Sequence, residues 1–213
     1  RGLWQEFGGE RVRNTPISEA VIAGSAIGAA MTGMRPVAEI MYIDFIPLSL
    51  EQINNQAAKV RYMFGGKCTV PLTIRTEGGA GRTLGAHHSQ SLEAWLIHIP
   101  GIRVVMPSTP ADAKGLLKSS IRDNNPVVFI EHKMLYNTKG EVPEGELIIP
   151  IGPADIKRKG DDITLITYSR MTLFCLEAAE QLAREGISAE VVDMRTLLPM
   201  DMETVVSSLK KTH

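Results

Sequence analysis

Residues 103–130 read RVVMPSTPADAKGLLKSSIRDNNPVVFI, and this stretch decides the fold class. Two short apolar runs rich in β-branched residues, Arg103 to Met106 and Val127 to Ile130, enclose a segment with helical spacing from Ala111 to Asp123. A strand, a helix and a second strand in this order predict a βαβ unit, in which the two strands lie parallel.

The same alternation continues on the N-terminal side of this unit. Apolar runs from Val37 to Met41 and from Val70 to Arg75 have the length and composition of strands. Between them, helical spacing predicts helices from Ser18 to Gly33 and from Leu48 to Phe64, and a third helix after a loop from Glu77 to Gln90. The pattern therefore predicts an α/β fold with a doubly wound, mostly parallel sheet.

The first of these helices has clear ends and an unusual interior. Ser18 is a good N-cap residue, and Gly33 is a natural residue to follow a helix. Gly24 and Gly28 lie inside the helix, where each glycine costs roughly 1 kcal/mol relative to alanine. We therefore expect another segment to pack very close to this helix.

A second domain is expected after the pattern breaks into Gly, Pro and acidic residues between Tyr136 and Pro153. We predict a first domain at residues 1–140, a linker at residues 141–153, and the first part of a second α/β domain at residues 154–213. That second part is expected to contain strands at Asp162 to Tyr168 and Ala189 to Asp193, and helices at Thr172 to Arg184 and Asp201 to Lys211. Because about 60 residues are marginal for an independent core, we expect this domain to be truncated and the chain to be a piece of a longer protein.

Composition excludes several classes of function. The 213 residues are 44% hydrophobic with a formal net charge of −1, and no basic cluster suggests a nucleic-acid partner. No apolar run approaches the roughly 18 to 20 residues that cross a bilayer, so no membrane partner is expected. Cys68 and Cys175 stand far apart and outside any CxxC pair, which indicates two buried thiols and neither a disulfide framework nor a zinc site.

Two glycine-rich stretches fail as phosphate-binding motifs. Residues 79–85 (GAGRTLG) place the last glycine one residue too late for GxGxxG, and residues 65–68 (GGKC) lack the spacing and the Ser or Thr of a P-loop. GxSxG and HExxH motifs are also absent from the sequence. Composition and periodicity alone therefore indicate an α/β domain without identifying its chemistry.

Two polar features allow either a structural or a functional interpretation. Glu19 puts a carboxylate at the start of a helix, where it either complements the helix dipole or takes part in chemistry. His87 and His88 lie in a loop just after a strand, where they are either solvated or close to a ligand, since ligands bind at strand ends in open parallel sheets.

The chain resembles the beta subunit of the thiamin-dependent first component of pyruvate dehydrogenase complexes. The resemblance is collinear along essentially the whole chain and rests on the runs Thr15 to Glu19, Gly28 to Met31, Arg35 to Glu39, Asn55 to Lys59, His88 to Gln90, Pro100-Gly101, Asp112 to Leu117, Arg122 to Pro126 and Met194 to Thr196 with Pro199. Residues 61–67 (RYMFGGK), 106–110 (MPSTP) and 131–133 (EHK) are more similar to acetoin dehydrogenase beta chains.

This resemblance implies a transketolase-like pyrimidine-binding fold followed by the first part of a transketolase C-terminal-like domain. It implies thiamin diphosphate as cofactor, with Glu19 hydrogen-bonded to the aminopyrimidine ring, Phe45 stacked on that ring, and Ile17 and Met41 as apolar walls. In the family His88 lies near the reaction centre, where a histidine can orient substrate or move protons. The family also binds a potassium ion through backbone carbonyls, and the matching residues are Leu72, Ser120, Ile121, Asp123 and Asn125.

The implied function is that of the beta subunit of an acetoin or pyruvate (2-oxo acid) dehydrogenase, which forms hydroxyethyl-thiamin and transfers the acyl group to a lipoyl domain. The chain lacks the GDG segment with which thiamin enzymes hold diphosphate and magnesium, and Gly160-Asp161-Asp162 is the nearest match. The resemblance therefore implies an alpha subunit that holds magnesium in an α2β2 heterotetramer, and a lipoyl domain of the dihydrolipoyl acyltransferase as second partner. The expected compartment is the cytoplasm of a bacterium, or the mitochondrial matrix or plastid of a eukaryote.

Two alternatives remain open at the level of sequence. The chain could be the pyrimidine domain of a single-chain transketolase-like enzyme, in which a GDG-bearing domain precedes it. It could also be a non-catalytic assembly subunit, which the joint presence of Glu19, Phe45 and His88 argues against.

Overall fold

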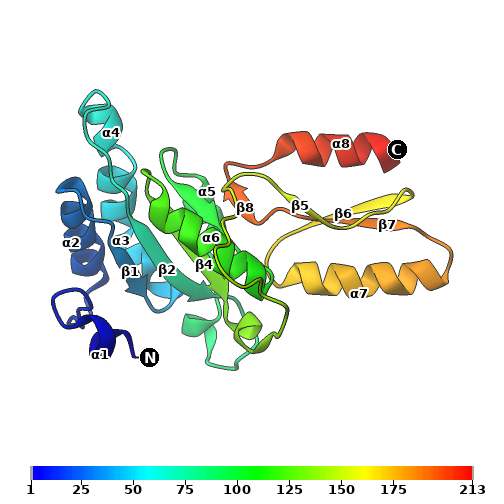
Figure 1. Cartoon of the computed structure of the whole chain (residues 1–213), viewed down its shortest axis with the longest axis horizontal. Coiled ribbons are helices and arrows are strands. Elements are labelled where there is room, and N and C mark those ends of the chain that lie inside the picture. The colour runs from blue at the N-terminus through cyan, green and yellow to red at the C-terminus, as the bar shows by residue number, and fades with distance from the viewer. Residues whose placement is uncertain (1, 213) are drawn as a thin grey trace.

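The computed structural model describes residues 2–212 and contains a main sheet of mostly parallel strands (Figure 1). Its strands are β1 (Val37–Ile40), β2 (Thr73–Gly78), β3 (Arg103–Val105), β4 (Val127–His132) and β8 (Thr196–Leu198), in the order β1-β2-β4-β3-β8. β1, β2, β4 and β3 are mutually parallel, and β8 pairs antiparallel with β3. The mostly parallel sheet predicted from residues 103–130 and their surroundings is confirmed.

Helices cover both faces of this sheet, because the side chains of β4 alternate between two apolar clusters. Val128 and Ile130 belong to the large core that includes α2 (Glu19–Met31) and the turn η2 (Gln52–Ala57). Val127 and Phe129 point to the other face and pack with Leu116 of α6 (Pro110–Arg122). The sheet is therefore doubly wound, as predicted.

The second face is incomplete over β1. Ala38 and Ile40 are buried against the large core, whereas Val37, Glu39 and Met41 are exposed on the opposite face. This edge of the sheet therefore presents an uncovered surface in the single chain.

α2 has the ends that the sequence predicts. Ser18 occupies the N-cap position with an extended backbone, although its side chain makes no capping hydrogen bond. At the other end Gly33 has φ 97°, and the N–H groups of Gly33 and Met34 donate to the carbonyls of Ala30 and Ala29. These two bonds form the Schellman arrangement, in which glycine tolerates the left-handed backbone.

The close packing predicted for α2 holds at one of its two glycines. A methyl group at Gly24 would lie 3.3 Å from the side-chain Oε1 of Gln52, so η2 approaches the helix closely there. Nothing lies within 4 Å of the corresponding position at Gly28. The space beside Gly28 is therefore open in this chain.

The single helix predicted from Leu48 to Phe64 is wrong in its continuity. The segment follows η1 (Ile43–Phe45) and consists of α3 (Ile46–Glu51), the π-helical η2 (Gln52–Ala57) and α4 (Val60–Met63). Ala58 N donates to Ile53 O over 3.0 Å, which widens the turn. The Lys59 ammonium then donates to the carbonyl of Asn54 at 2.7 Å and satisfies an oxygen that an α-helix would have used.

The strand predicted from Val70 to Arg75 begins later, at Thr73. Val70 and Leu72 are buried as expected, but Pro71 stands between them and has no N–H for a sheet ladder. Leu72 N donates instead to Val70 O at 2.8 Å, which forms a tight turn before the strand.

After residue 154 the chain forms a smaller sheet in the order β5-β7-β6, with β5 (Asp155–Arg158), β6 (Ile163–Thr167) and β7 (Ala189–Asp193). Helices α7 (Met171–Arg184) and α8 (Met202–Thr212) lie on opposite sides of it (Figure 1). These positions confirm the predicted elements, whereas β5 and β8 were not predicted. Because β8 returns to the main sheet, the two sheets are tied together along one edge.

The irregular segment from residue 138 to residue 154 packs along α6 and forms no helix or strand, and the structure describes all of it. Ser119 Oγ donates to the carbonyl of Ile149 at 2.5 Å, and Lys114 Nζ donates to that of Pro143 at 2.6 Å. A methyl group at Gly115 would overlap the Ile149 side chain. The predicted linker is therefore a packed layer over the helix.

Two further properties concern the predictions made for the cysteines and for membrane spans. Cys68 and Cys175 are free but half-buried, so the prediction of two buried thiols is wrong. Each packs at the margin of an apolar cluster. Among residues 2–212, every helix is too short or too polar to span a membrane.

The remaining short elements are α1 (Leu3–Phe7), η3 (Ala86–His88), α5 (Glu93–Ile97) and η4 (Lys133–Asn137). α5 is the short helix predicted after the loop from Glu77 to Gln90, and η3 lies inside that loop.

Candidate functional site

The candidate site lies where β1, β2 and β4 end. Their parallel pairing brings their carboxyl ends to one edge of the sheet. Met41 and η1 follow β1, the loop of residues 79–90 follows β2, and Lys133 follows β4. Chain segments far apart in the sequence thus meet at one edge.

Phe45 and His88 are brought together at this edge. Their ring centroids are 5.6 Å apart with planes inclined by 77°, and Tyr42 makes a similar edge contact with His88 at 5.3 Å. The structure therefore joins two of the residues that the resemblance singled out, and it adds Tyr42, which the sequence analysis missed.

The loop that carries His88 is anchored at its far end. Gln90 N donates to Oδ1 of the buried Asp44 at 3.0 Å, and Gly79 N donates to the carbonyl of Gln90 at 2.9 Å. These bonds fasten the loop of residues 79–90 to η1 and to the end of β2.

Glu19 is placed at the same edge by the direction of its helix. α2 precedes β1 and packs against it in the antiparallel sense, so that the start of α2 lies towards the end of β1 (Figure 1). The Glu19 side chain is half-buried, and its carboxylate has no hydrogen bond or ion pair among residues 2–212. Glu19 thus combines partial burial with an unused charged group.

Ile17 and Met41 are exposed in the single chain, at 89% and 55% respectively. They form no enclosed wall with other described residues. Both are large apolar side chains that the single chain leaves open to solvent.

His132 and Gly79 fit each other closely behind the loop. The Nδ1 atom of His132 accepts a hydrogen bond from Met134 N at 3.2 Å, and a methyl group at Gly79 would overlap the imidazole ring. Burial, together with the nearby charges of Arg170 and Lys133, lowers the pKa of His132 to about 4. His132 is therefore neutral at physiological pH and acts as a packing partner of the loop.

A polar cluster lies on the uncovered face of the sheet, next to Met41. Arg75 makes two hydrogen bonds of 2.8 Å to the carboxylate of Glu131 and one of 2.9 Å to Glu39. Tyr136 OH donates to Glu131 at 2.6 Å, and burial followed by the carboxylate of Glu131 raises the pKa of Tyr136. Only the pairing of strands could have revealed this cluster, since its members are far apart in the sequence.

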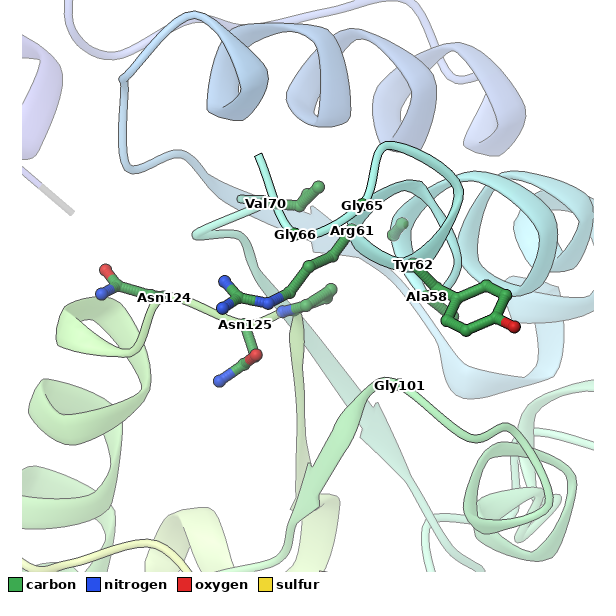
Figure 2. A pocket seen from close by; sticks show the side chains of 11 residues that line it. Ala58, Arg61, Tyr62, Gly65, Gly66, Val70, Gly101, Asn124 and Asn125 are labelled. Atoms are coloured by element: carbon green, nitrogen blue, oxygen red, sulfur yellow. The ribbon is translucent and has the colours of Figure 1, made fainter. Parts of the chain in front are cut away.

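A hollow lies at the opposite edge of the sheet, where the strands begin. It has a volume of about 470 Å³, and Figure 2 shows Arg61 of α4 and the Asn124–Asn125 turn facing it. Val70 and Gly101, which precede β2 and β3, also line it. It is therefore separate from the edge that carries His88 and Phe45.

The residues whose backbone carbonyls the family resemblance implies as potassium ligands also lie at the edge of the sheet where the strands begin. Ile121 O and Asp123 O accept hydrogen bonds of 3.1 and 2.8 Å from one nitrogen of Arg35. Leu72 O accepts from Val127 N, and Ser120 O from Asp123 N. A carbonyl oxygen has two lone pairs, so each could contact a cation in addition, but the Arg35 guanidinium already binds the oxygens of Ile121 and Asp123.

Comparison with protein families identifies the family to which the chain belongs. Residues 1–139 match the model of the transketolase pyrimidine-binding domain, and residues 152–213 match that of the transketolase C-terminal domain. The chain belongs to the transketolase pyrimidine-binding family. The transketolase-like fold predicted from the resemblance is confirmed.

Curated relatives match this transketolase-family chain along its whole length. It is 55% identical over 212 residues to the acetoin:2,6-dichlorophenolindophenol oxidoreductase subunit beta of Cupriavidus necator, and 51% identical over 212 residues to the 2-oxoisovalerate dehydrogenase subunit beta of Bacillus subtilis. The human mitochondrial pyruvate dehydrogenase E1 component subunit beta is 48% identical over 217 residues. The matches cover 99–100% of the chain but 62%, 65% and 60% of these relatives, so the chain spans less than two thirds of their length.

A solved structure shares the fold of the pyrimidine-binding family with this chain. It is described as a split gene transketolase, inactive beta4 tetramer, and superposes with a TM-score of 0.82 at 26% identity. The match covers 98% of this chain and 65% of that one.

Proposed function

We propose that this chain is the pyrimidine-binding part of the beta subunit of a thiamin-diphosphate-dependent acetoin or 2-oxo acid dehydrogenase. The observation that carries the proposal is the half-buried Glu19 carboxylate at the start of α2, which has no hydrogen bond or ion pair among residues 2–212, together with the contact between His88 and Phe45. The names of the relatives support the proposal, because they are beta subunits of oxidoreductases that act on acetoin, 2-oxoisovalerate or pyruvate.

The residues at this edge fit the aminopyrimidine end of thiamin diphosphate. An aminopyrimidine is a flat aromatic ring with an exocyclic amino group and two ring nitrogens, of which one is the more basic. Its face suits an aromatic surface and apolar side chains, and its more basic nitrogen suits a carboxylate that has no partner among residues 2–212. In the proposal Phe45 stacks on the ring, while Ile17 and Met41 cover its borders. The cofactor supplies the carbanion chemistry at the substrate carbonyl, and the protein supplies orientation and electrostatics.

Glu19 is proposed to hold a proton at the ring nitrogen. A carboxylate that a bound ring and a partner chain enclose loses water, which raises its affinity for a proton towards that of the nitrogen. His88, whose ring is in edge contact with Phe45, is proposed to orient the substrate or move a proton during acyl transfer.

The diphosphate and magnesium are assigned to an alpha subunit. The sequence has no GDG segment, and the exposed Ile17 and Met41 supply an apolar surface for such a partner. An α2β2 heterotetramer places the cofactor across the subunit contact, and a lipoyl domain of the acyltransferase is the proposed acceptor of the acyl group. We keep potassium as a proposal for the carbonyls of Leu72, Ser120, Ile121, Asp123 and Asn125.

The full-length protein, co-expressed with its alpha subunit, tests the proposal through Glu19→Gln. We expect the variant to assemble normally and to lose nearly all turnover on acetoin or pyruvate under saturating cofactor. Glu10→Gln, which alters an exposed carboxylate outside the site, should retain wild-type turnover. Full activity of Glu19→Gln would remove Glu19 from the mechanism, and assembly without any turnover in the wild type would favour the non-catalytic alternative.

A further inference from the structure

Lys133 is a buried cation at the candidate site. It is the first residue of η4, directly after β4, and only 1% of it is exposed. No carboxylate lies within ion-pair distance of its ammonium group among residues 2–212. A lysine so deeply buried is ordinarily paired with an acid.

The contacts of the Lys133 ammonium lead to His88. Its Nζ atom donates to the backbone carbonyl of His88 at 2.5 Å and lies 4.3 Å from the centre of the Tyr42 ring. The same Tyr42 ring is in edge contact with the His88 imidazole. Lys133 therefore fixes both the backbone of His88 and the ring against which its side chain rests.

A second bond runs in the opposite direction between the same two segments. Arg82, in the loop of residues 79–90, donates through Nη2 to the backbone carbonyl of Lys133 at 3.0 Å. Side chains from each segment thus bind the backbone of the other, one bond before η3 at Arg82 and one at its last residue, His88. Reciprocal bonds of this kind fix the position of the loop more firmly than one bond would.

Stability alone does not account for a lysine at this position. Removing an ammonium group from water is costly, and one carbonyl with one aromatic face replaces only part of its hydration. Apolar side chains of similar volume often give equal or greater stability in place of buried charges. The geometry of the contacts points instead to a role in positioning.

We propose that Lys133 is a positioning residue that holds His88 in the orientation required for the reaction. This inference rests on the proposed function for the role of His88. The positional part can be measured without turnover. Lys133 acts through the carbonyl of His88 and the ring of Tyr42, so its removal should leave cofactor binding largely intact while the chemical step slows.

Lys133→Met, which keeps the volume and removes the donor, is the main test in the full-length protein assembled with its alpha subunit. We expect kcat to fall by about 10- to 100-fold, the range that a small misplacement of a reacting group produces, with little change in the half-saturating cofactor concentration. Amide hydrogen exchange of residues 85–90 should speed up. Lys139→Met, an exposed lysine in the following segment, is the matched control and should change none of these quantities.

A double-mutant comparison separates positioning from general support of the fold. In a His88→Ala background, Lys133→Met should cause no further loss of kcat, because its effect passes through His88. An equal loss in both backgrounds would overturn the proposal, as would unchanged kcat and unchanged exchange in Lys133→Met. Should Lys133→Met fail to fold, Lys133→Arg and Tyr42→Leu, which disturb the same contacts in other ways, replace it under the same criteria.

These experiments distinguish failure of the proposed function from failure of the inference about Lys133. An inactive wild-type complex would contradict the function, and faster exchange at residues 85–90 in Lys133→Met would still support the positional claim. An active wild type with no effect of Lys133→Met would leave the function intact and contradict this inference alone.

Discussion

The imidazole of His88 stands edge-on to the phenyl ring of Phe45, with ring centroids 5.6 Å apart. The two residues come from different loops and meet only because β1 and β2 are parallel neighbours. The contact ties the proposed stacking ring to the histidine that is proposed to act near the reaction centre. A change in Phe45 should therefore affect both cofactor binding and the chemical step.

Phe45→Leu should weaken cofactor binding in the assembled complex. Aromatic contacts contribute about 0.5–1.5 kcal/mol beyond the area they bury, which corresponds to a rise of roughly 2- to 10-fold in the half-saturating thiamin diphosphate concentration. Phe174→Leu, on α7 of the second sheet, provides a control at an exposed phenylalanine. Titration of activity with thiamin diphosphate measures the effect, and equal curves for both variants would contradict the stacking role.

Gly79→Ala should disrupt the loop that carries His88. Gly79 has φ 84°, and its missing side chain leaves the space that the His132 ring occupies. Alanine must therefore displace His132 in addition to adopting a left-handed backbone, which alone costs roughly 1–2 kcal/mol. We expect a large loss of turnover and of urea resistance.

Gly145→Ala separates these two causes. Gly145 has a similar φ of 73°, but nothing lies within 4 Å of the position that a methyl group would take. This variant should show only the backbone cost. Equal losses of unfolding free energy for the two variants would mean that the contact with His132 is unimportant.

Arg75→Met should destabilise the fold because it leaves two carboxylates without their partner. Arg75 binds Glu131 through two nitrogens and Glu39 through the third. Hydrogen bonds to charged groups contribute about 1.5–3 kcal/mol, so we expect a loss of this order in the free energy of unfolding. Arg13→Met removes an exposed pair with Glu10 and should cost less than about 1 kcal/mol, which urea denaturation of both variants would check.

Local periodicity was enough to predict the main sheet, because β4 and its neighbours are apolar runs separated by helical spacing. It could not predict that the helix around residues 46–63 is interrupted. That interruption depends on the Lys59 ammonium reaching the carbonyl of Asn54 and on the close approach of Gln52 to Gly24. Nor could it predict β8, a three-residue strand whose pairing with β3 is a long-range contact.

The candidate site was predictable only in part. Glu19, Phe45 and His88 were identified through the resemblance, and their residue types alone allowed a structural interpretation. Lys133 carried no signal of its own, since a lysine after a strand is ordinarily solvated. Its importance depends on which carbonyl its ammonium group reaches, and that is decided by the parallel pairing of β2 and β4.

The dependence of stability on pH should reflect two groups that act in opposite directions. Asp193 is fully buried where β7 meets Ser108, Lys157 and Asp112, and burial raises its pKa to about 6. The native state then binds its proton more tightly than the unfolded chain does. Asp193 therefore stabilises the fold at low pH and loses this contribution as the pH rises from about 4 to about 6, by roughly 3 kcal/mol at most.

His132 has the opposite effect over nearly the same range. Burial lowers its pKa to about 4 from the ordinary value of 6.5, so the native state binds a proton less tightly than the unfolded chain. Its contribution is present above pH 6.5 and is lost as the pH falls through 4. The pKa values of Asp112 and Asp201 are lowered from the ordinary value. At Asp112 the hydrogen bonds from Lys157 and Thr109 outweigh burial, and at Asp201 those from the N–H and hydroxyl of Thr204 do so.

In the wild type, the opposite effects of Asp193 and His132 on the free energy of unfolding largely cancel as the pH changes. Replacing either residue should therefore make the pH dependence due to the other measurable. Asp193→Asn leaves the effect of His132, so the free energy of unfolding should rise between pH 4 and pH 6.5. His132→Asn, which keeps an acceptor for the Met134 N–H, leaves the effect of Asp193, so the free energy should fall over the same interval. Urea denaturation at half-unit steps of pH measures both slopes, and two variants that merely run parallel to the wild type would show that neither group titrates in this range.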